Sequence, residues 1–196
     1  MRSVLRFSRL VSCVLGIALL SVGAAVAAEP AAREEAETSR LDTLFMDLKR
    51  ERNEKAAERI AQRIWDEWMK SGSATIDLLL QWSSEATRKK EFAVALDFLD
   101  QIVMLEPDYA EGWNRRATVH YMMDSYSKSM ADIERTLNLE PRHFGALSGM
   151  GAILKATGRK ELALRAYERV LAIYPMMRNA QNEVVTLTEE LAGEGI

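Results

Sequence analysis

The residue types that most often carry out chemistry in enzymes are sparse in this chain. Its 196 residues include two histidines, His120 and His143, and one cysteine, Cys13. An imidazole beside a carboxylate could act as a general base, and several such groups together could hold a metal ion. Neither histidine lies in a His-Glu-x-x-His motif, and the chain has no cysteine pair and no Gly-x-Ser-x-Gly sequence. The sequence therefore predicts no catalytic, metal or cofactor site, and we expect the protein not to be an enzyme.

Three glycines, Gly145, Gly149 and Gly151, have a spacing that resembles a nucleotide-binding loop. Such a loop follows a strand, whereas the residues around these glycines have the apolar pattern of a helix. We therefore interpret them as helix positions where another segment can approach. His120 occupies a helix position suited to a half-buried, hydrogen-bonded side chain, and we interpret His143 as a surface or inter-repeat residue.

The prolines indicate how the elements are organised. Pro107, Pro141 and Pro175 lie 34 residues apart, and the apolar residues upstream of each recur in the same helical phase. A proline disfavours helix for the residue before it, so each one predicts a helix end. The residues expected at these ends are Glu106, Glu140 and Tyr174. A period of this length is typical of a helix-turn-helix unit that must stack on neighbours to bury its apolar face.

Small residues recur at one position in each of the expected helices. Large apolar residues flank these positions, so two helix backbones can approach closely where the side chain is small. The small positions are Ser83, Ala117 and Gly151 in the first helices of the units, and Ala95, Ser129 and Ala163 in the second helices. Both helices of a unit are thus expected to face a shared core.

On these residues the sequence resembles the tetratricopeptide repeat family. The family signature places a Trp and a small residue in the first helix and a proline after the second, as Trp113, Ala117 and Pro141 do here. Tyr167 and Pro175 match the signature in the next unit, whereas Arg116 departs from it. The resemblance implies an all-α fold, a right-handed superhelix of stacked antiparallel helix pairs with a C-terminal capping helix. It also implies a scaffold that binds proteins, because this fold supports many unrelated binding functions.

The period divides the chain into segments. Residues 41–73 are expected to form a degenerate helix pair, with Trp65 and Trp68 on its second helix and a stop at Ser71-Gly72-Ser73. The three clearer units are residues 74–107, 108–141 and 142–175, and residues 176–196 form a capping helix and tail. Residues 29–40 are small and charged and are interpreted as a flexible linker.

Residues 1–28 have the composition of an export signal. Arg2, Arg6 and Arg9 precede an uncharged run of 19 residues, 10–28, which ends in small residues. We expect cleavage near Ala28, followed by a periplasmic or secreted location. Two alternatives stay open: the run is long enough to remain as an inner-membrane anchor, and the arginines share a helical face as in a mitochondrial presequence. Residues 10–13, ending in Cys13, resemble a lipoprotein cleavage box, but the apolar run follows the cysteine instead of preceding it.

The charge balance argues against nucleic acid as a partner. The whole chain has a formal net charge of −3, with 26 Lys+Arg and 29 Asp+Glu. Removal of the three signal arginines leaves 23 basic residues against 29 acidic ones, a charge of −6. Such a surface does not attract nucleic acid non-specifically. We expect another protein or a peptide segment as the partner, with membrane contact only through an uncleaved signal.

The first helices of stacked units line a concave face, where repeat scaffolds of this kind usually bind partners. Rotation away from the core stripe gives the residues expected on that face. They are Leu80, Gln81, Ser84, Thr87, Asn114, Arg115, Thr118, Tyr121, Met122, Ser148, Gly149, Ala152 and Lys155. The alternative interpretation is that Tyr121 and Met122 only pack between units.

These observations predict an exported adaptor that binds proteins through its concave face, in the periplasm of a Gram-negative bacterium. Two other functions stay open. One is a membrane-tethered factor for envelope assembly or stability, in which the apolar run is retained. The other is a small-ligand carrier or enzyme using His120, Tyr121 and Lys155, which the missing catalytic motifs disfavour.

Overall fold

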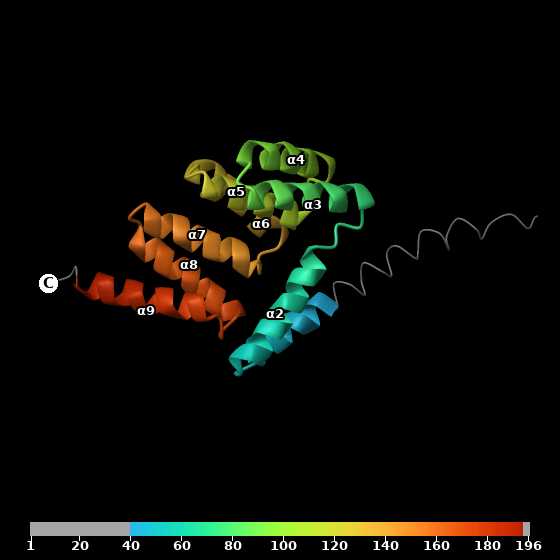
Figure 1. The fold of residues 1–196 in the computed structure, drawn as a ribbon. Coiled ribbons are helices and arrows are strands. Elements are labelled where there is room, and N and C mark those ends of the chain that lie inside the picture. The colour runs from blue at the N-terminus through green and yellow to red at the C-terminus, as the bar shows by residue number, and fades with distance from the viewer. Residues whose placement is uncertain (1–39, 194–196) are drawn as a thin grey trace, which may run out of the picture. The chain divides into compact units, whose positions relative to one another are not determined.

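The computed structural model describes residues 40–193, which belong to one compact unit, and their regular structure is entirely helical (Figure 1). The expected signal and most of the expected linker lie outside these residues. The nine helices in this range span residues 40–50, α2 (Glu54–Trp68), α3 (Ala74–Arg88), α4 (Phe92–Leu105), α5 (Ala110–Met122), α6 (Tyr126–Leu139), α7 (Phe144–Ala156), α8 (Lys160–Ile173) and α9 (Arg178–Gly193). Within that range, no helix combines the length and apolarity needed to cross a bilayer.

Helices α3 to α8 form three antiparallel pairs in the order of the sequence period. The second helices end where the prolines predict, because the residue before each proline is the C-cap. The three C-cap residues are Glu106 for α4, Glu140 for α6 and Tyr174 for α8. The predicted helix ends and the all-α stacked architecture are therefore confirmed.

The small residues allow the paired helices to approach closely, as the sequence predicts. In the second pair, the Ser129 hydroxyl on α6 donates to the carbonyl oxygen of Ala117 on α5 at 2.8 Å. In the third pair, a Cβ atom added at Gly151 would lie 2.8 Å from the ring of Tyr167. Any side chain at Gly151, or one larger than serine at position 129, would therefore force the paired helices apart.

The turn inside each pair uses a left-handed backbone conformation at equivalent positions 34 residues apart. The φ angles are 62° at Lys90, 54° at Asp124 and 74° at Gly158. Glycine adopts this conformation without steric cost, whereas lysine and aspartate do not. The first two pairs therefore keep the turn geometry of the third without its favoured residue.

Helix α9 covers the C-terminal end of the stack. Its buried side chains, Ala180 and Leu187, join the apolar cluster of α7 and α8. Two ion pairs add to this packing: Lys155 to Glu183 at 2.6 Å and Lys160 to Glu190 at 3.1 Å. The rest of the helix is largely polar on its outer side, as a terminal cap requires.

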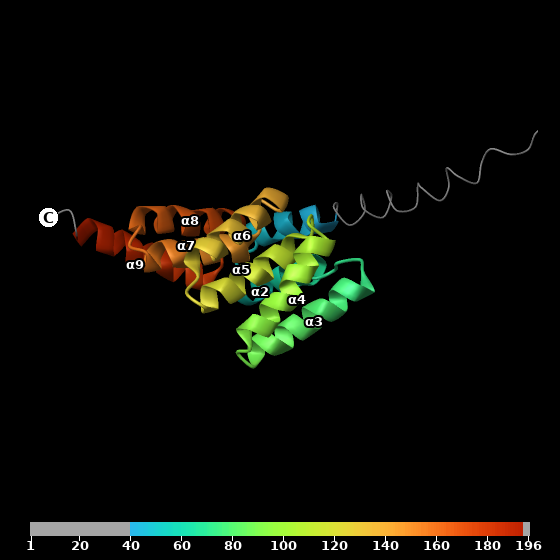
Figure 2. The same ribbon diagram turned by 90° about the horizontal axis from the view of Figure 1, so that it is seen from above.

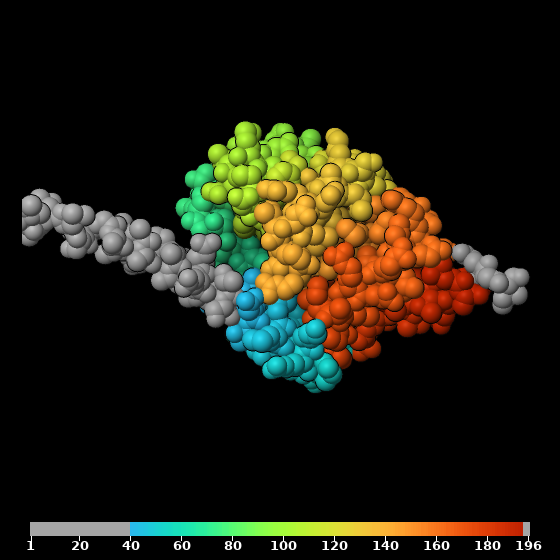
Figure 3. Space-filling view, turned by 180° about the vertical axis from the view of Figure 1, so that it is seen from behind, coloured from blue at the N-terminus to red at the C-terminus, as the bar shows by residue number. Residues whose placement is uncertain are grey.

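The first helix pair, residues 40–50 and α2, has a different place from the one its sequence phase suggests. Its buried apolar side chains, Leu44, Phe45, Leu48, Ile64 and Trp68, belong to the cluster of α7, α8 and α9. The buried side chains of α3 and α4 form a separate cluster with Val119 of α5. Figure 3 shows the blue and cyan segment against the orange and red helices. The pair therefore folds back onto the later units instead of continuing the stack beyond α3.

Two ion pairs hold the folded-back helix pair against residues that are distant from it in the sequence. The Arg142 guanidinium binds Asp42 at 2.6 Å and lies over the ring of Phe45, 4.2 Å from its centroid. The Arg178 guanidinium at the start of α9 binds Glu54 at the start of α2. The reversal takes place at Gly72, whose φ of 75° suits glycine.

Candidate functional site

The residues predicted to line the concave face lie on the first helices α3, α5 and α7. Most of its predicted residues do reach the surface. Gln81, Ser84, Thr118, Tyr121 and Met122 are exposed, and Thr87, Arg115, Ser148, Gly149, Ala152 and Lys155 are partly exposed. Leu80 and Asn114 are buried, in contrast to the prediction.

A cavity of about 230 Å³ lies between α3 and α5 on this face. It is lined by Ser83, Ser84, Thr87, Arg88, Leu99, Arg115, Thr118 and Val119. We call this cavity the open groove; Tyr121 and Met122 are exposed one turn after Thr118 on α5, and the ring of Tyr121 lies beside that of Tyr126. The structure thus brings together four of the predicted residues, Ser84, Thr87, Arg115 and Thr118, around one cavity.

Two threonine hydroxyl groups of the open groove are arranged to accept hydrogen bonds. Thr87 Oγ1 donates to the carbonyl oxygen of Ser83 at 2.7 Å, and Thr118 Oγ1 donates to that of Asn114 at 2.9 Å. Each hydroxyl proton is therefore used within its own helix, which leaves oxygen lone pairs for donors on a ligand. The backbone N–H groups of an extended segment are donors of this kind.

Charged side chains at the rim of the cavity are held in place by neighbours on their own helices. The Arg88 guanidinium on α3 binds Glu85 at 2.7 Å, and Arg115 Nε on α5 donates to Glu111 Oε1 at 2.5 Å. The Arg115 guanidinium also contacts the sulfur of Met69, which follows α2. Both arginines are thus oriented before any ligand arrives.

The other half of the concave face is covered by the end of α2 and the residue after it. The rings of Trp68 and His143 stack 4.0 Å apart at an interplanar angle of 9°. The indole of Trp65 lies so close to α7 that a Cβ atom added at Gly145 would be 2.6 Å from it. Met69 packs on the cluster that contains Leu80. The chain itself therefore occupies the face where α5 and α7 begin.

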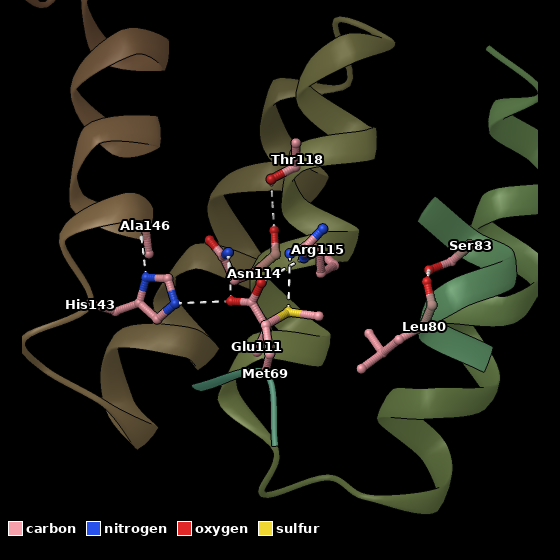
Figure 4. A network of polar contacts seen from close by, with 9 residues as sticks. All are labelled: Met69, Leu80, Ser83, Glu111, Asn114, Arg115, Thr118, His143 and Ala146. Atoms are coloured by element: carbon pink, nitrogen blue, oxygen red, sulfur yellow. Dashed lines mark hydrogen bonds and ion pairs between the residues drawn. The ribbon is translucent and has the colours of Figure 1, made fainter. Parts of the chain in front are cut away.

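Glu111 on α5 is the centre of the polar network beneath this cover (Figure 4). Its side chain is completely buried, and it accepts hydrogen bonds from Arg115 and, at 2.9 Å, from Asn114 Nδ2. The third contact is with His143 Nε2, 3.1 Å from Glu111 Oε2. His143 Nδ1 accepts from the backbone N–H of Ala146 at 3.0 Å, so the proton of a neutral ring lies on Nε2 and points at Glu111.

This network explains the positions of Asn114 and His143. The amide of Asn114 is used inside the protein by Glu111 and is not available to a partner. His143 is completely buried and serves as the N-cap of α7, between α2 and α5. Of the two interpretations made from the sequence, the inter-repeat one describes His143 and the surface one does not.

A second network replaces apolar packing at Arg116, the residue that departs from the family signature. Its guanidinium binds Asp132 of α6 at 2.7 Å and Asp100 of α4 at 2.8 Å. His120 lies 3.9 Å from the same Asp132, and burial lowers its pKa, partly opposed by the Asp132 charge. These groups join α4, α5 and α6, and they form a packing network as the sequence suggested for His120.

At the other end of the concave face, two predicted residues are engaged by α9 or by their own helix. The Lys155 ammonium pairs with Glu183, so its charge is already balanced. The Ser148 hydroxyl donates to the carbonyl oxygen of Phe144 at 2.8 Å. The described residues contain no group of three His, Cys, Asp or Glu side chains suited to a metal ion.

The sequence reasoning missed Arg88, Glu111 and the cover formed by Trp65 and Trp68. The 34-residue period could have identified Glu111, because this residue is equivalent to Asp77 one unit earlier and to Gly145 one unit later. These positions begin the first helices one turn before the predicted face. A predicted face that extended one turn further toward the N-terminus of each first helix would have included these positions.

Comparisons with known proteins agree with this geometry. No family model matches the chain. A curated TPR repeat-containing protein from Rhizobium etli is 58% identical over 154 residues, which cover 79% of this chain and 76% of that protein. The solved first TPR domain of Spaghetti (RPAP3), bound to an HSP90 peptide, has a TM-score of 0.59 at 22% identity and covers 61% of this chain and 95% of its own. The structure of MamA has a TM-score of 0.57 at 20% identity, covering 70% of this chain and 81% of its own.

Proposed function

Because this chain belongs to the tetratricopeptide repeat family, we propose that it is an exported adaptor that binds a segment of another protein in the open groove. Repeats of this family mediate interactions between proteins and are typically non-catalytic scaffolds. The observation that carries the proposal is the cavity between α3 and α5, whose lining includes four of the predicted residues, Ser84, Thr87, Arg115 and Thr118.

The chemistry of the groove suits an extended peptide segment. The hydroxyl oxygens of Thr87 and Thr118 can accept from backbone N–H groups, and Tyr121 and Met122, exposed one turn after Thr118 on α5, offer apolar contact. The similar RPAP3 domain binds a peptide of HSP90, which supports a peptide ligand of this general kind. A shallow groove of this size gives a dissociation constant of about 1 to 100 μM, or about −8 to −5.5 kcal/mol.

The proposed binding site is tested with a substitution that fills the open groove and leaves the ion pairs around it unchanged. Thr118→Trp places a large ring in the cavity, and we expect at least about a tenfold loss of partner affinity. Thr188→Trp is the matched control, because Thr188 on α9 is also exposed and also donates to the carbonyl oxygen four residues earlier. It should bind as tightly as the wild type.

The partner is identified by placing a photo-crosslinking amino acid at Ser84 in the protein expressed in its native host, with mass spectrometry of the product. The same crosslinker at the exposed Glu168 of α8 is the control. Crosslinks from Ser84 alone support the groove. Equal crosslinking from Glu168, or equal binding by Thr118→Trp, would place the binding site elsewhere.

The exported location is part of the same proposal and rests on residues 1–28, with their arginines, apolar run and small residues. N-terminal sequencing of the protein from its native host should find a first residue of Ala28 or Glu29. A chain that begins at Met1 and fractionates with membranes would favour the membrane-tethered assembly factor instead.

A further inference from the structure

The outer face of α3 and α4 is apolar where the stack would be expected to end in polar residues. Figure 2 shows these two helices at one end of the stack. Besides Met104, which is 74% exposed, four large apolar side chains on these helices are exposed: Leu78 by 43%, Trp82 by 46%, Val94 by 43% and Leu105 by 58%. A terminal repeat normally needs a polar outer surface for solubility. We call the surface formed by these four residues and Phe98 the outer face.

The 34-residue period identifies what this face is built to contact. The residues equivalent to Leu78 are Gly112 and Ala146, which are buried in the later units. A Cβ atom at Gly112 would lie 2.8 Å from Ile102 of the preceding pair. The residue equivalent to Trp82 is Arg116, which binds Asp100 of the preceding pair. The part of the outer face around Leu78 and Trp82 therefore corresponds to the surface on which the later pairs stack, and its neighbouring pair is missing because the first helix pair folds back onto α7 to α9.

The outer face contains a pocket in addition to its exposed apolar side chains. The pocket has a volume of about 330 Å³ and is lined by Trp82, Glu85, Ala86, Glu91, Val94 and Phe98. The rings of Trp82 and Phe98 form one wall, with centroids 5.5 Å apart. Aromatic residues in such pockets are the side chains that contribute most to protein interfaces.

The charges around the pocket are balanced. Glu85 is paired with Arg88 at 2.7 Å and with Lys89 at 3.3 Å, and Glu91 is the second acidic residue of the lining. The pocket lining thus contains two carboxylates, and two cations outside the lining pair with Glu85. A surface with balanced charge can meet its own copy without the repulsion that a strongly acidic or basic patch would cause.

The opposite end of the stack does not provide a matching apolar surface. Ala180 and Leu187 of α9 are buried within the chain, and Val185 is the one large apolar residue that this helix exposes. Head-to-tail addition of a second copy would therefore leave most of the outer face without an apolar counterpart. A two-fold pairing covers the same face on both copies and closes the assembly.

We propose that the protein forms a two-fold dimer in which the outer face of α3 and α4 packs against the same face of a second copy. The dimer leaves both open grooves accessible, because those are on the concave side of the first helices. The adaptor would then present two partner sites, and their binding would gain from avidity. The proposal is independent of what the groove binds.

The test is sedimentation equilibrium of the protein purified from its native host. We expect a mass twice that of the chain at about 100 μM. Val94→Arg puts a long charged side chain in the apolar centre of the proposed interface and should raise the dimer dissociation constant at least about tenfold. Val185→Arg is the matched control, because it changes an exposed valine on α9, and it should leave the dimer unchanged. Leu105→Arg gives a second interface variant, and circular dichroism verifies that each variant is folded.

The outcomes that would overturn the proposal are distinct. A wild-type chain that stays monomeric at about 100 μM would show that the outer face contacts another partner or none. A dimer unaffected by both Val94→Arg and Leu105→Arg would place the interface elsewhere. Assemblies that grow beyond the dimer and weaken with Val185→Arg would indicate head-to-tail stacking.

Discussion

Glu111 shows at the scale of a single residue how the concave face is fixed. A buried carboxylate costs several kcal/mol in lost hydration unless its oxygens are satisfied. Here Arg115 and Asn114 donate from the same helix, and the His143 ring donates from the start of the next first helix. The charge therefore ties α5 to α7 at the point where Trp68 stacks on His143.

We expect Glu111→Ala to lower the free energy of unfolding by about 3 kcal/mol, because it leaves the Arg115 charge and the buried His143 N–H without their acceptor. Urea denaturation measures the change. Glu168→Ala, at an exposed position on α8, is the control and should change stability by less than about 0.5 kcal/mol. A loss below about 1 kcal/mol for Glu111→Ala would mean that the network contributes little to stability.

At the scale of the elements, the turns between paired helices use one geometry with three different residues. Lys90, Asp124 and Gly158 are all left-handed, and only the last has no steric cost. The first two pairs therefore carry a local strain that the neighbouring helices overcome.

Lys90→Gly should relieve this strain and raise stability by about 0.5 to 1 kcal/mol. The neighbouring Lys89 provides the control, because any residue can adopt its φ of −79° without strain. Lys89→Gly should give no gain, and it also removes the contact with Glu85. Thermal unfolding of both variants measures the difference, and equal effects from the two substitutions would contradict the explanation.

The features that the sequence predicts well are those set by local or periodic constraints. Helix ends at Glu106 and Glu140 follow from the missing N–H and the ring of the next proline. The close approach at Gly151 follows from the recurrence of small residues in phase with the repeat. The sequence showed Arg116 only as a departure from the family signature, because the residues that it binds, Asp100 and Asp132, lie in other helices.

The candidate site was predictable only in part, for a physical reason. Helical rotation places Ser84 and Thr118 on the exposed face, and the structure agrees. Leu80 has the same rotation but is buried, because Met69 packs on its cluster. The apolar faces of the first helix pair require a partner, and the sequence period does not say which of several apolar surfaces will provide it.

At the scale of the whole molecule, the folded-back helix pair controls how much of the concave face is available. Its indole rings lie against the start of α7, and its ion pairs reach Arg142 and Arg178. Any loosening of this pair would enlarge the open groove toward Glu111 and His143.

Two glycines of α7 allow this to be tested with the same substitution. A methyl group at Gly145 would lie 2.6 Å from Trp65, whereas one at Gly149 would meet Ile133 at an ordinary 3.5 Å. We expect Gly145→Ala to displace Trp65 and speed hydrogen exchange across residues 40–68, with the later repeats unaffected. Gly149→Ala should leave that exchange slow. Equal protection in both variants would show that the first pair tolerates the shift without detaching.

The contact between the beginning and the end of the described chain affects the order in which the protein folds. Arg142 binds Asp42 across 100 residues of sequence, and Arg178 binds Glu54 across 124. Helices stacked only on their neighbours can form one after another as the chain emerges from its N-terminus, whereas these first helices must wait for the last ones. The helices that emerge first are thus among the last to dock, so the order of assembly reverses the order of emergence.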